Sequence, residues 1–249
     1  MSTAASTETP GRTETTPRAI EPEQRTAAKV AGLLYVVMMV PGVFAEFYAR
    51  GSLIVPSDAV QTARNIAASE RLFRVGIVGN LITFAVDVIL VWALYVVLRP
   101  VNRNLALLAA FWRLAECSIL GVITLNDFAA LRLLGGASYL RAVDESQLQA
   151  LARFFLGLQG DGYRIGLVFF GLGSTVFAFL WLNSRYVPGV LAAWGIFSSL
   201  VVTIVTLAIM VFPGLAPVVI PAYYAPIFVF EITLGLWLLI KGIRAPIVG

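Results

Sequence analysis

Apolar residues fill six stretches of this chain, and polar residues gather between them. Each stretch is about as long as a helix that crosses the hydrocarbon core of a bilayer, roughly 20 residues. The predicted spans are Ala28–Tyr48, Phe73–Leu98, Leu105–Leu131, Tyr163–Leu182, Gly189–Val211 and Tyr223–Ile240. We therefore expect an all-α fold, a polytopic membrane helix bundle with six transmembrane helices. Pro41-Gly42 inside the first span predicts a kink or a local unwinding.

Two of the connecting segments have a helical pattern of their own. Asp58–Leu72 follows a capping residue, Ser57, and Glu145–Leu156 carries its apolar residues on one face. Both segments predict short amphipathic helices that lie on the outer membrane surface. The glycines at 157, 160 and 162 then predict a loop before the fourth span, with a hinged or re-entrant entry as the alternative.

The two ends of the chain differ from its apolar body. Residues 1–26 are rich in Thr, Ser, Glu and Pro, which is typical of a disordered tail, and residues 245–249 form a short C-terminal tail. Residues 27–244 make up the six-span membrane domain. Basic residues in the even-numbered loops and after the last span have no acidic neighbours, whereas the first and third loops carry acidic residues as well. With two basic residues before the first span, they favour both termini in the cytoplasm: Arg25, Lys29, Arg99, Arg103, Arg185, Lys241 and Arg244.

Composition narrows the classes of function. The chain has 249 residues and is 59% hydrophobic, above the usual apolar share of roughly 45–50%. Its net charge of +4 comes from residues at helix ends, so we expect the lipid bilayer as a partner and no nucleic acid. The absence of histidine excludes imidazole ligands and histidine bases, and the single Cys117 offers no cysteine pair. We expect no metal and no cofactor, and the oligomeric state stays open.

Four ionisable residues lie near the middle of three predicted spans: Asp87, Arg113, Glu116 and Glu231. A charge at the bilayer centre costs at least about 2.5–3.5 kcal/mol, so we expect these side chains to face the bundle interior. Each lies roughly 12–16 Å from the cytoplasmic end of its span, at about 1.5 Å per residue. Three carboxylates and one guanidinium leave a formal excess of two negative charges, which protons, a cation or a cationic ligand group must offset. These four residues are the candidate ligand-binding site.

The third span carries residues of the midplane site and of a second polar layer nearer the outer surface. Arg113 and Glu116 are i,i+3 neighbours that can pair, and Asp127 falls on the same helix face within roughly 60°. A pair that only fixes helix packing is the alternative interpretation. An outer polar layer is predicted from Glu46, Arg74 and Asp127, either as interfacial salt bridges or as an outer vestibule.

Several short motifs together resemble a known family. They are Ala31-Gly32-Leu33-Leu34-Tyr35, Phe44-Ala45-Glu46-Phe47-Tyr48, Leu72-Phe73-Arg74, Pro100-Val101-Asn102, Phe111–Glu116, Gly166-Leu167-Val168-Phe169-Phe170-Gly171 and Glu231–Gly242. As a set they resemble the bacterial integral-membrane family catalogued as domain of unknown function 4386, over about residues 26–244. The chain departs from that pattern after Phe170-Gly171, where Gly173-Ser174-Thr175 replaces bulkier residues.

The resemblance implies a multi-pass protein of the bacterial inner membrane, and it brings no activity. It also implies that six charged residues occupy signature positions: Glu46, Arg74, Asp87, Arg113, Glu116 and Glu231.

Three functions stay open. The first is binding or conduction of a small molecule or ion at the midplane residues. The second is a structural or regulatory membrane subunit whose polar core specifies packing. The third is a membrane-embedded enzyme in which Glu116 or Asp87 acts as acid and base while Arg113 holds an anionic group. The lack of histidine and of an activated nucleophile argues against the enzyme, and catalytic residues stay unknown.

Overall fold

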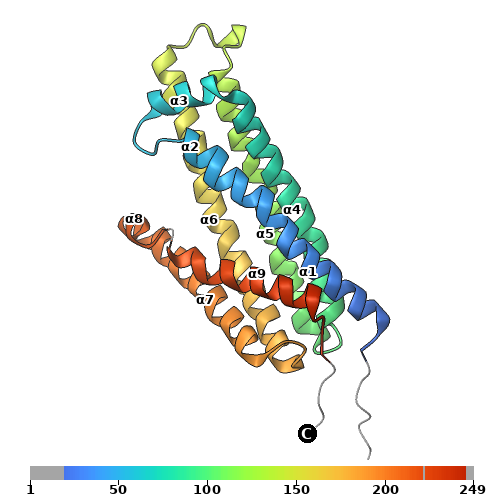
Figure 1. Cartoon of the computed structure of the whole chain (residues 1–249). Coiled ribbons are helices and arrows are strands. Elements are labelled where there is room, and N and C mark those ends of the chain that lie inside the picture. Colours follow the sequence, from blue (N-terminus) through green and yellow to red (C-terminus); the bar gives the residue numbers. More distant parts are fainter. Residues whose placement is uncertain (1–19, 221, 245–249) are drawn as a thin grey trace, which may run out of the picture.

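The computed structural model describes residues 20–220 and 222–244, and these residues form helices and turns with no strand. Six of the described helical segments are long and apolar enough to cross a membrane. They are built from α1 (Pro22–Val43) with its extension to Leu53, α4 (Glu70–Leu98), α5 (Arg103–Leu134), α6 (Glu145–Ser184), α7 (Gly189–Val211) and α9 (Ala225–Ile240) with the turn before it. The predicted all-α membrane bundle is confirmed (Figure 1).

The first span stays helical through Pro41 and Gly42, where the sequence predicts a kink or a local unwinding. The helical pattern changes just afterwards, from α1 to the π-helix η1 (Phe44–Arg50), and the short α2 (Gly51–Leu53) follows. Proline has no N–H to donate to the preceding turn, and a wider π turn is one way in which a helix accommodates such a defect.

The two predicted amphipathic segments differ in outcome. The first is present as α3 (Ala59–Ala68), but its cap is Asp58 rather than Ser57, since the Asp58 carboxylate accepts the Gln61 N–H at 2.8 Å. The second is helical as predicted, but it is the first part of the 40-residue α6 and not a separate helix.

The predicted glycine loop at 157–162 is therefore wrong. A glycine in a helix costs about 1 kcal/mol, which is small where packing favours the helix. Gly162 and Gly166 are buried in α6 and lie against Ile123 and Leu120 of α5, so the missing side chains let the two helices approach.

Short segments complete the chain: η2 (Ser138–Leu140), η3 (Pro213–Leu215), α8 (Ala216–Val219) and η4 (Ala222–Tyr224). The chain enters α1 and leaves α9 at the same end of the bundle, which we call the terminal end. The opposite end carries α3 and is called the α3 end (Figure 1).

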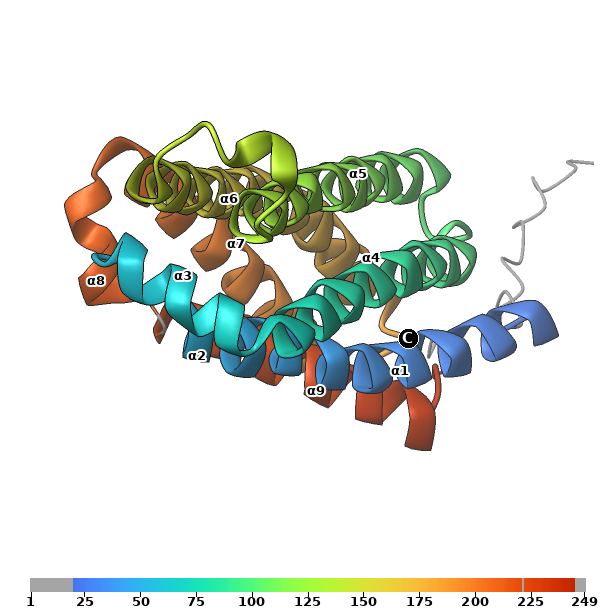
Figure 2. The same cartoon turned by 90° about the horizontal axis from the view of Figure 1, so that it is seen from above.

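The six long helices form a closed ring. Going round it, α1 packs against α4, α4 against α5, α5 against α6, α6 against α7, α7 against α9, and α9 returns to α1 (Figure 2). In this order α9 stands opposite α5, and α1 stands opposite α6. Side chains that face inward from opposite helices therefore meet in one shared interior.

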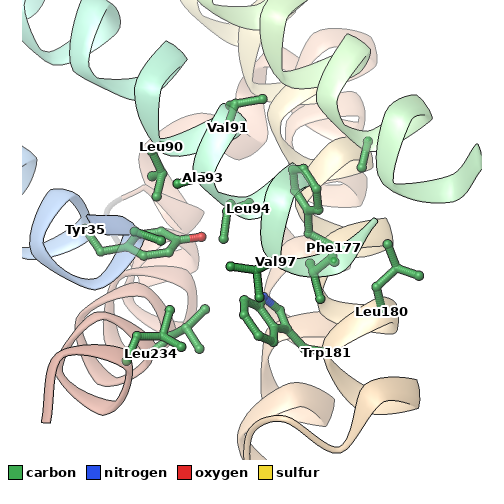
Figure 3. Packing of buried hydrophobic residues seen from close by; sticks show 14 of the residues in the cluster. Tyr35, Leu90, Val91, Ala93, Leu94, Val97, Phe177, Leu180, Trp181 and Leu234 are labelled. Carbon is green, nitrogen blue, oxygen red and sulfur yellow. The ribbon is translucent and has the colours of Figure 1, made fainter. Parts of the chain in front are cut away.

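Two apolar clusters fill the ends of this interior. The terminal-end core joins all six long helices around fully buried residues such as Leu94, Trp181 and Leu234 (Figure 3). The α3-end core is smaller and gathers Leu53, Ile66, Phe73, Ile77, Ala130, Leu131, Ala152 and Leu156. Along α4 and α5, the polar residues singled out from the sequence fall between these two cores.

The outward face of the ring is apolar. Val40, Leu125 and Ile204, on three different helices, are 72%, 67% and 62% exposed. Exposed apolar surface on this scale is typical of contact with lipid chains, so the structure fits a multi-pass membrane protein.

Candidate functional site

Arg113 is the centre of the buried charged residues. Its Nη2 lies 2.6 Å from Oδ1 of Asp87 on α4, and its Nη1 lies 3.2 Å from Oε2 of Glu116 one turn further along α5. The side chains of Arg113, Asp87 and Glu116 are only 4%, 5% and 7% exposed. The predicted pair between Arg113 and Glu116 is present, and the shorter contact joins two helices.

Helix α6 supplies the rest of the surroundings of Arg113. Ser174 Oγ accepts from Nη1 at 3.4 Å, and the guanidinium carbon lies 4.2 Å from the centre of the Phe170 ring. A Cβ on Gly173 would lie 2.8 Å from Cγ of Arg113, so only glycine leaves room for this side chain. The Gly173-Ser174-Thr175 segment is therefore where α6 packs against the Arg113 side chain.

Cys117 belongs to the same cluster, although no pattern in the sequence singles out a lone cysteine inside a helix. Its thiol donates to Oδ2 of Asp87 at 3.1 Å. The spacing of 30 residues between them holds no local signal, because the contact depends on how α4 packs against α5.

Cys117, Asp87 and Glu116 bring ligand atoms within 4.8 Å of one another, which is close enough to surround a metal ion. The Arg113 guanidinium already binds oxygens of both carboxylates, and its positive charge repels a metal cation from the same place. The arrangement therefore fits an arginine-centred cluster better than a metal site.

Glu231 completes the central cluster from the other side of the ring. Helix α9 stands opposite α5, and Glu231 lies within electrostatic range of Arg113 and Asp87. No salt bridge within 4.0 Å links it to a basic group in the part of the chain that the structure describes. Glu231 is half-buried, although Ile227 and Leu234 on the same helix face are fully buried. Glu231 therefore keeps more exposed surface than its neighbours one turn away on the same face of α9.

A close crossing of α1 and α9 sets the position of Glu231. A Cβ on Gly32 would lie 2.8 Å from the carbonyl oxygen of Gly235, and a Cβ on Gly235 would lie 2.8 Å from Cβ of Tyr35. The two glycines thus let the backbones touch, one turn from Glu231. Tyr35 points from α1 into the bundle, with its hydroxyl directed away from its own helix (Figure 3). It lies within electrostatic range of Glu231, Arg113 and Asp87.

A second charged group, the Arg50 cluster, lies nearer the α3 end. Nη1 of Arg50 is 2.5 Å from Oδ1 of Asp127, and Nε is 3.7 Å from Oε2 of Glu46. Nδ2 of Asn80 donates to the other Glu46 oxygen at 2.7 Å. These four residues come from η1, α4 and α5, and two of them, Glu46 and Asp127, belong to the predicted outer polar layer.

Arg74, the third residue predicted for that layer, lies elsewhere. Its Nε is 2.6 Å from Oε1 of Glu70 one turn away, and both side chains are about half exposed. The pattern of charges along the chain could not distinguish Arg50 from Arg74, because the choice depends on which helix face turns inward. Arg74 forms a surface pair, and Arg50 takes the inward position.

Tyr163 on α6 lies between the two clusters. It is within electrostatic range of Glu46 on one side and of Glu116 and Glu231 on the other, and also of Tyr223. Like Glu231 it is half-buried on an otherwise buried helix face, between Gln159 and Gly166. Tyr163 is therefore a polar residue of α6 within electrostatic range of both clusters.

Comparison with known proteins identifies the family and gives no activity. No curated protein and no solved structure matches the chain. A family model described as a domain of unknown function matches residues 30–242, which is nearly the whole described length. The matched range begins about two turns after the start of α1 and ends just after α9, so it takes in all six spans. The chain belongs to the family described as Domain of unknown function (DUF4386).

Proposed function

We propose that this membrane protein binds a small cationic ligand in the interior of its helix ring, with Asp87, Arg113, Glu116 and Glu231 as the site. The main support for this proposal is that the cluster holds three carboxylates and one guanidinium group. Arg113 is shared by Asp87 and Glu116, and Glu231 faces them across the ring with no salt bridge among the described residues.

The excess negative charge matters because the four residues lie deep in the membrane. At about 1.5 Å per residue, all four residues lie roughly 13–20 Å along their helices from the terminal end, near the middle of a hydrocarbon core about 30 Å thick. An uncompensated charge there costs at least about 2.5–3.5 kcal/mol, so a bound positive group stabilises the folded protein. The same stabilisation contributes to the free energy with which a cationic ligand binds.

The half-buried state of Glu231 supports a ligand over pure packing. A carboxylate whose only role is to fix helix contacts is expected to pair with a donor on a neighbouring helix, as Asp87 does. Glu231 instead is half-buried and has no salt bridge to a basic group among the described residues. A ligand with a positive group would supply the missing partner.

A structural or regulatory subunit is the second candidate, and one observation favours it. Asp87, Arg113, Glu116, Cys117 and Ser174 already satisfy one another across three helices, as a packing cluster does. In that case the central cluster holds α4, α5 and α6 together and no ligand enters.

Ligand-dependent stability separates the two candidates. The melting temperature of the purified full-length chain is measured in detergent with sodium, potassium, choline and spermidine chlorides at equal ionic strength. Binding predicts that one cation raises the melting temperature saturably above the others, because a ligand that binds only the folded state stabilises it by RT ln(1 + [L]/Kd). Native mass spectrometry of the same sample tests for a co-purified small molecule.

Two variants make this test specific. Glu231→Gln keeps the shape of the side chain and removes its charge, so it should abolish the cation-dependent rise. Glu70→Gln removes a carboxylate from an exposed pair at the α3 end and should leave the rise intact. If all four salts act alike on the wild-type chain and no small molecule co-purifies, the packing candidate is correct.

We further propose a bacterial inner-membrane location with both termini in the cytoplasm. The loops between α4 and α5 and between α6 and α7 lie at the terminal end and carry Arg99, Arg103 and Arg185, which supports this orientation. Fusion of a reporter that is active only in the cytoplasm to the C-terminus tests it. An inactive reporter on a membrane-inserted chain would exclude the orientation.

A further inference from the structure

A groove with a volume of about 350 Å³ lies where α6, α7, η3 and α8 meet, and we call it the α6–α7 groove. This volume falls within the range of small-molecule sites, roughly 300–1,000 Å³. The lining combines one pair of opposite charges with apolar side chains, and its residues belong to neither charged cluster. They are Asp161, Arg164, Ile165, Ile209, Met210, Pro213 and Ala216.

The end of α7 gives the groove its wall on the α3 side. Helix α7 ends at Val211, shortly before Pro213, which has no N–H with which to continue the helical bonding. The chain turns through η3, where the Leu215 N–H donates to the Phe212 carbonyl at 3.0 Å, and enters α8 beyond the end of α7 (Figure 1). Pro213 and Ala216 of this turn therefore line the groove together with α6 and α7.

The groove lies at the level where the hydrocarbon core meets the lipid headgroups. At about 1.5 Å per residue, Arg164 and Ile209 are each about 30 Å along their helices from the terminal end. The hydrocarbon core is itself about 30 Å thick. Tyr223 and Tyr224, with ring centroids 4.1 Å apart, precede α9 on the same side, and tyrosine is typical of the membrane interface. Lipid headgroups are therefore the molecules that surround this groove.

We propose that the α6–α7 groove binds one phospholipid with a zwitterionic ethanolamine headgroup. Arg164 binds the phosphate, Asp161 binds the ammonium group, and an acyl chain lies against Ile165 and Met210. This site is separate from the central cluster and does not depend on the proposed function.

The charge pair matches a zwitterion better than a single ion. Nη1 of Arg164 lies 2.5 Å from Oδ1 of Asp161, and the two side chains are 34% and 67% exposed. Among the described residues this is the only hydrogen bond that either side chain makes, so Nε and Nη2 of Arg164 and Oδ2 of Asp161 can still bind a ligand. The two charges cancel, so the pair attracts neither a lone cation nor a lone anion strongly, whereas a zwitterion satisfies both groups.

The order of residues along α6 fits the orientation of a lipid. Asp161 lies one turn further from the terminal end than Arg164, about 4.5 Å along the helix. Ethanolamine joins its phosphate and ammonium groups through two carbons, so one headgroup can reach both side chains. Ile165 follows Arg164 on the membrane side, and Ile165 and Met210 are 43% and 46% exposed. They give an acyl chain apolar surface next to the charged pair.

A comparison of headgroups tests this site. Native mass spectrometry of the full-length chain in detergent measures the Kd of phosphatidylethanolamine, phosphatidylcholine and phosphatidylglycerol with identical acyl chains. Only the first carries both a phosphate for Arg164 and ammonium N–H groups for Asp161. We expect one phosphatidylethanolamine to bind with a Kd at least about fivefold below those of the other two lipids.

Variants of the groove assign this preference to its residues. Arg164→Gln and Asp161→Asn should each reduce the preference to less than about twofold, since each removes one of the two charges. Ala216→Phe keeps both charges and fills the groove, so it should weaken the binding of all three lipids. Arg74→Gln and Glu70→Gln are the matched controls, because they break an exposed ion pair on α4 and should leave the preference unchanged.

Four outcomes would overturn the inference. Equal Kd values for the three lipids would make the pair an ordinary interfacial salt bridge, and tighter binding of phosphatidylglycerol would make the groove an anion site. A preference that survives both Arg164→Gln and Asp161→Asn would place the lipid elsewhere. Glycerophosphoethanolamine, the headgroup without acyl chains, should not displace the lipid at equal concentration, and displacement would mean that the groove takes a soluble phosphate. None of these outcomes involves Glu231, so the proposed function is judged by its own test.

Discussion

The two charged clusters inside the ring use the same parts and reach different balances. In the Arg50 cluster one arginine joins two carboxylates, and an amide donates to one of them. In the central cluster one arginine also joins two carboxylates, and a third, Glu231, faces them across the ring. The Arg50 cluster keeps contact with the surface, since its Glu46 side chain is 31% exposed, whereas the side chains of Arg113, Asp87 and Glu116 are at most 7% exposed. The Arg50 cluster thus has a formal excess of one negative charge, and the deeper central cluster has an excess of two.

The largest expected effect comes from Arg113→Leu. Loss of the guanidinium leaves Asp87 and Glu116 buried without a cation, which costs about 3–5 kcal/mol. We expect little folded protein in the membrane, measured as the yield of monodisperse protein and its melting temperature. Arg74→Leu, in an exposed pair, is the control and should change stability by less than about 1 kcal/mol.

A triple variant checks the reason for this loss. Adding Asp87→Asn and Glu116→Gln to Arg113→Leu removes both stranded charges and should recover much of the yield. If the triple variant is as poor as the single one, shape and not charge explains the loss.

The next effect is expected from Gly235→Ala, which acts on the central cluster alone. The added Cβ would lie 2.8 Å from Cβ of Tyr35, so α9 must shift away from α1 and take Glu231 with it. Overpacking of this kind costs about 1–3 kcal/mol. Melting temperature should fall, and so should any cation-dependent rise. Gly121→Ala is the matched control, because no atom lies within 4 Å of its added Cβ. Equal melting temperatures for the two variants would contradict the close crossing.

Asp127→Asn should have a smaller effect. Arg50 keeps Glu46 as its partner, so the change removes one charge-assisted contact and costs about 1–2 kcal/mol. If the buried central cluster is the more sensitive of the two, Asp127→Asn should lose clearly less stability than Arg113→Leu in the same melting assay. Equal losses for the two variants would mean that depth in the membrane does not distinguish the two clusters.

The smallest effect on stability is expected from Glu231→Gln. Removal of a carboxylate without a salt bridge relieves negative charge and should leave the melting temperature without ligand unchanged or slightly higher, by less than about 1 kcal/mol. A marked destabilisation in the absence of any ligand would show that Glu231 has a structural partner.

The sequence predicted what depends on position along one helix. Hydropathy located all six spans, with α7 at its observed bounds, and the i,i+3 spacing predicted the pair of Arg113 with Glu116. Both depend only on the chain near each residue.

What the sequence could not predict depends on the order of helices around the ring. The contact of Asp87 with Arg113, the role of Cys117 and the choice of Arg50 over Arg74 each require knowing which helix faces meet. The rule that charged side chains in a membrane span turn inward or reach the interface fits Arg50 and Arg74 equally well, so it could not choose between them. The glycines near residue 160 led to a wrong prediction of a loop. They lie inside α6, because the close contact of α5 with α6 favours small residues there.

The length of α6 affects how the protein unfolds. Forty residues of helix extend about 60 Å, twice the thickness of the hydrocarbon core, so a substantial part of α6 stands in water with α3 and the neighbouring ends of α4 and α5. The small apolar core there is held by the hydrophobic effect, which urea weakens, whereas lipid surrounds the packed helices of the other half. Chemical denaturation should therefore proceed in two steps, the loss of the projecting α3-end core before that of the membrane-embedded ring.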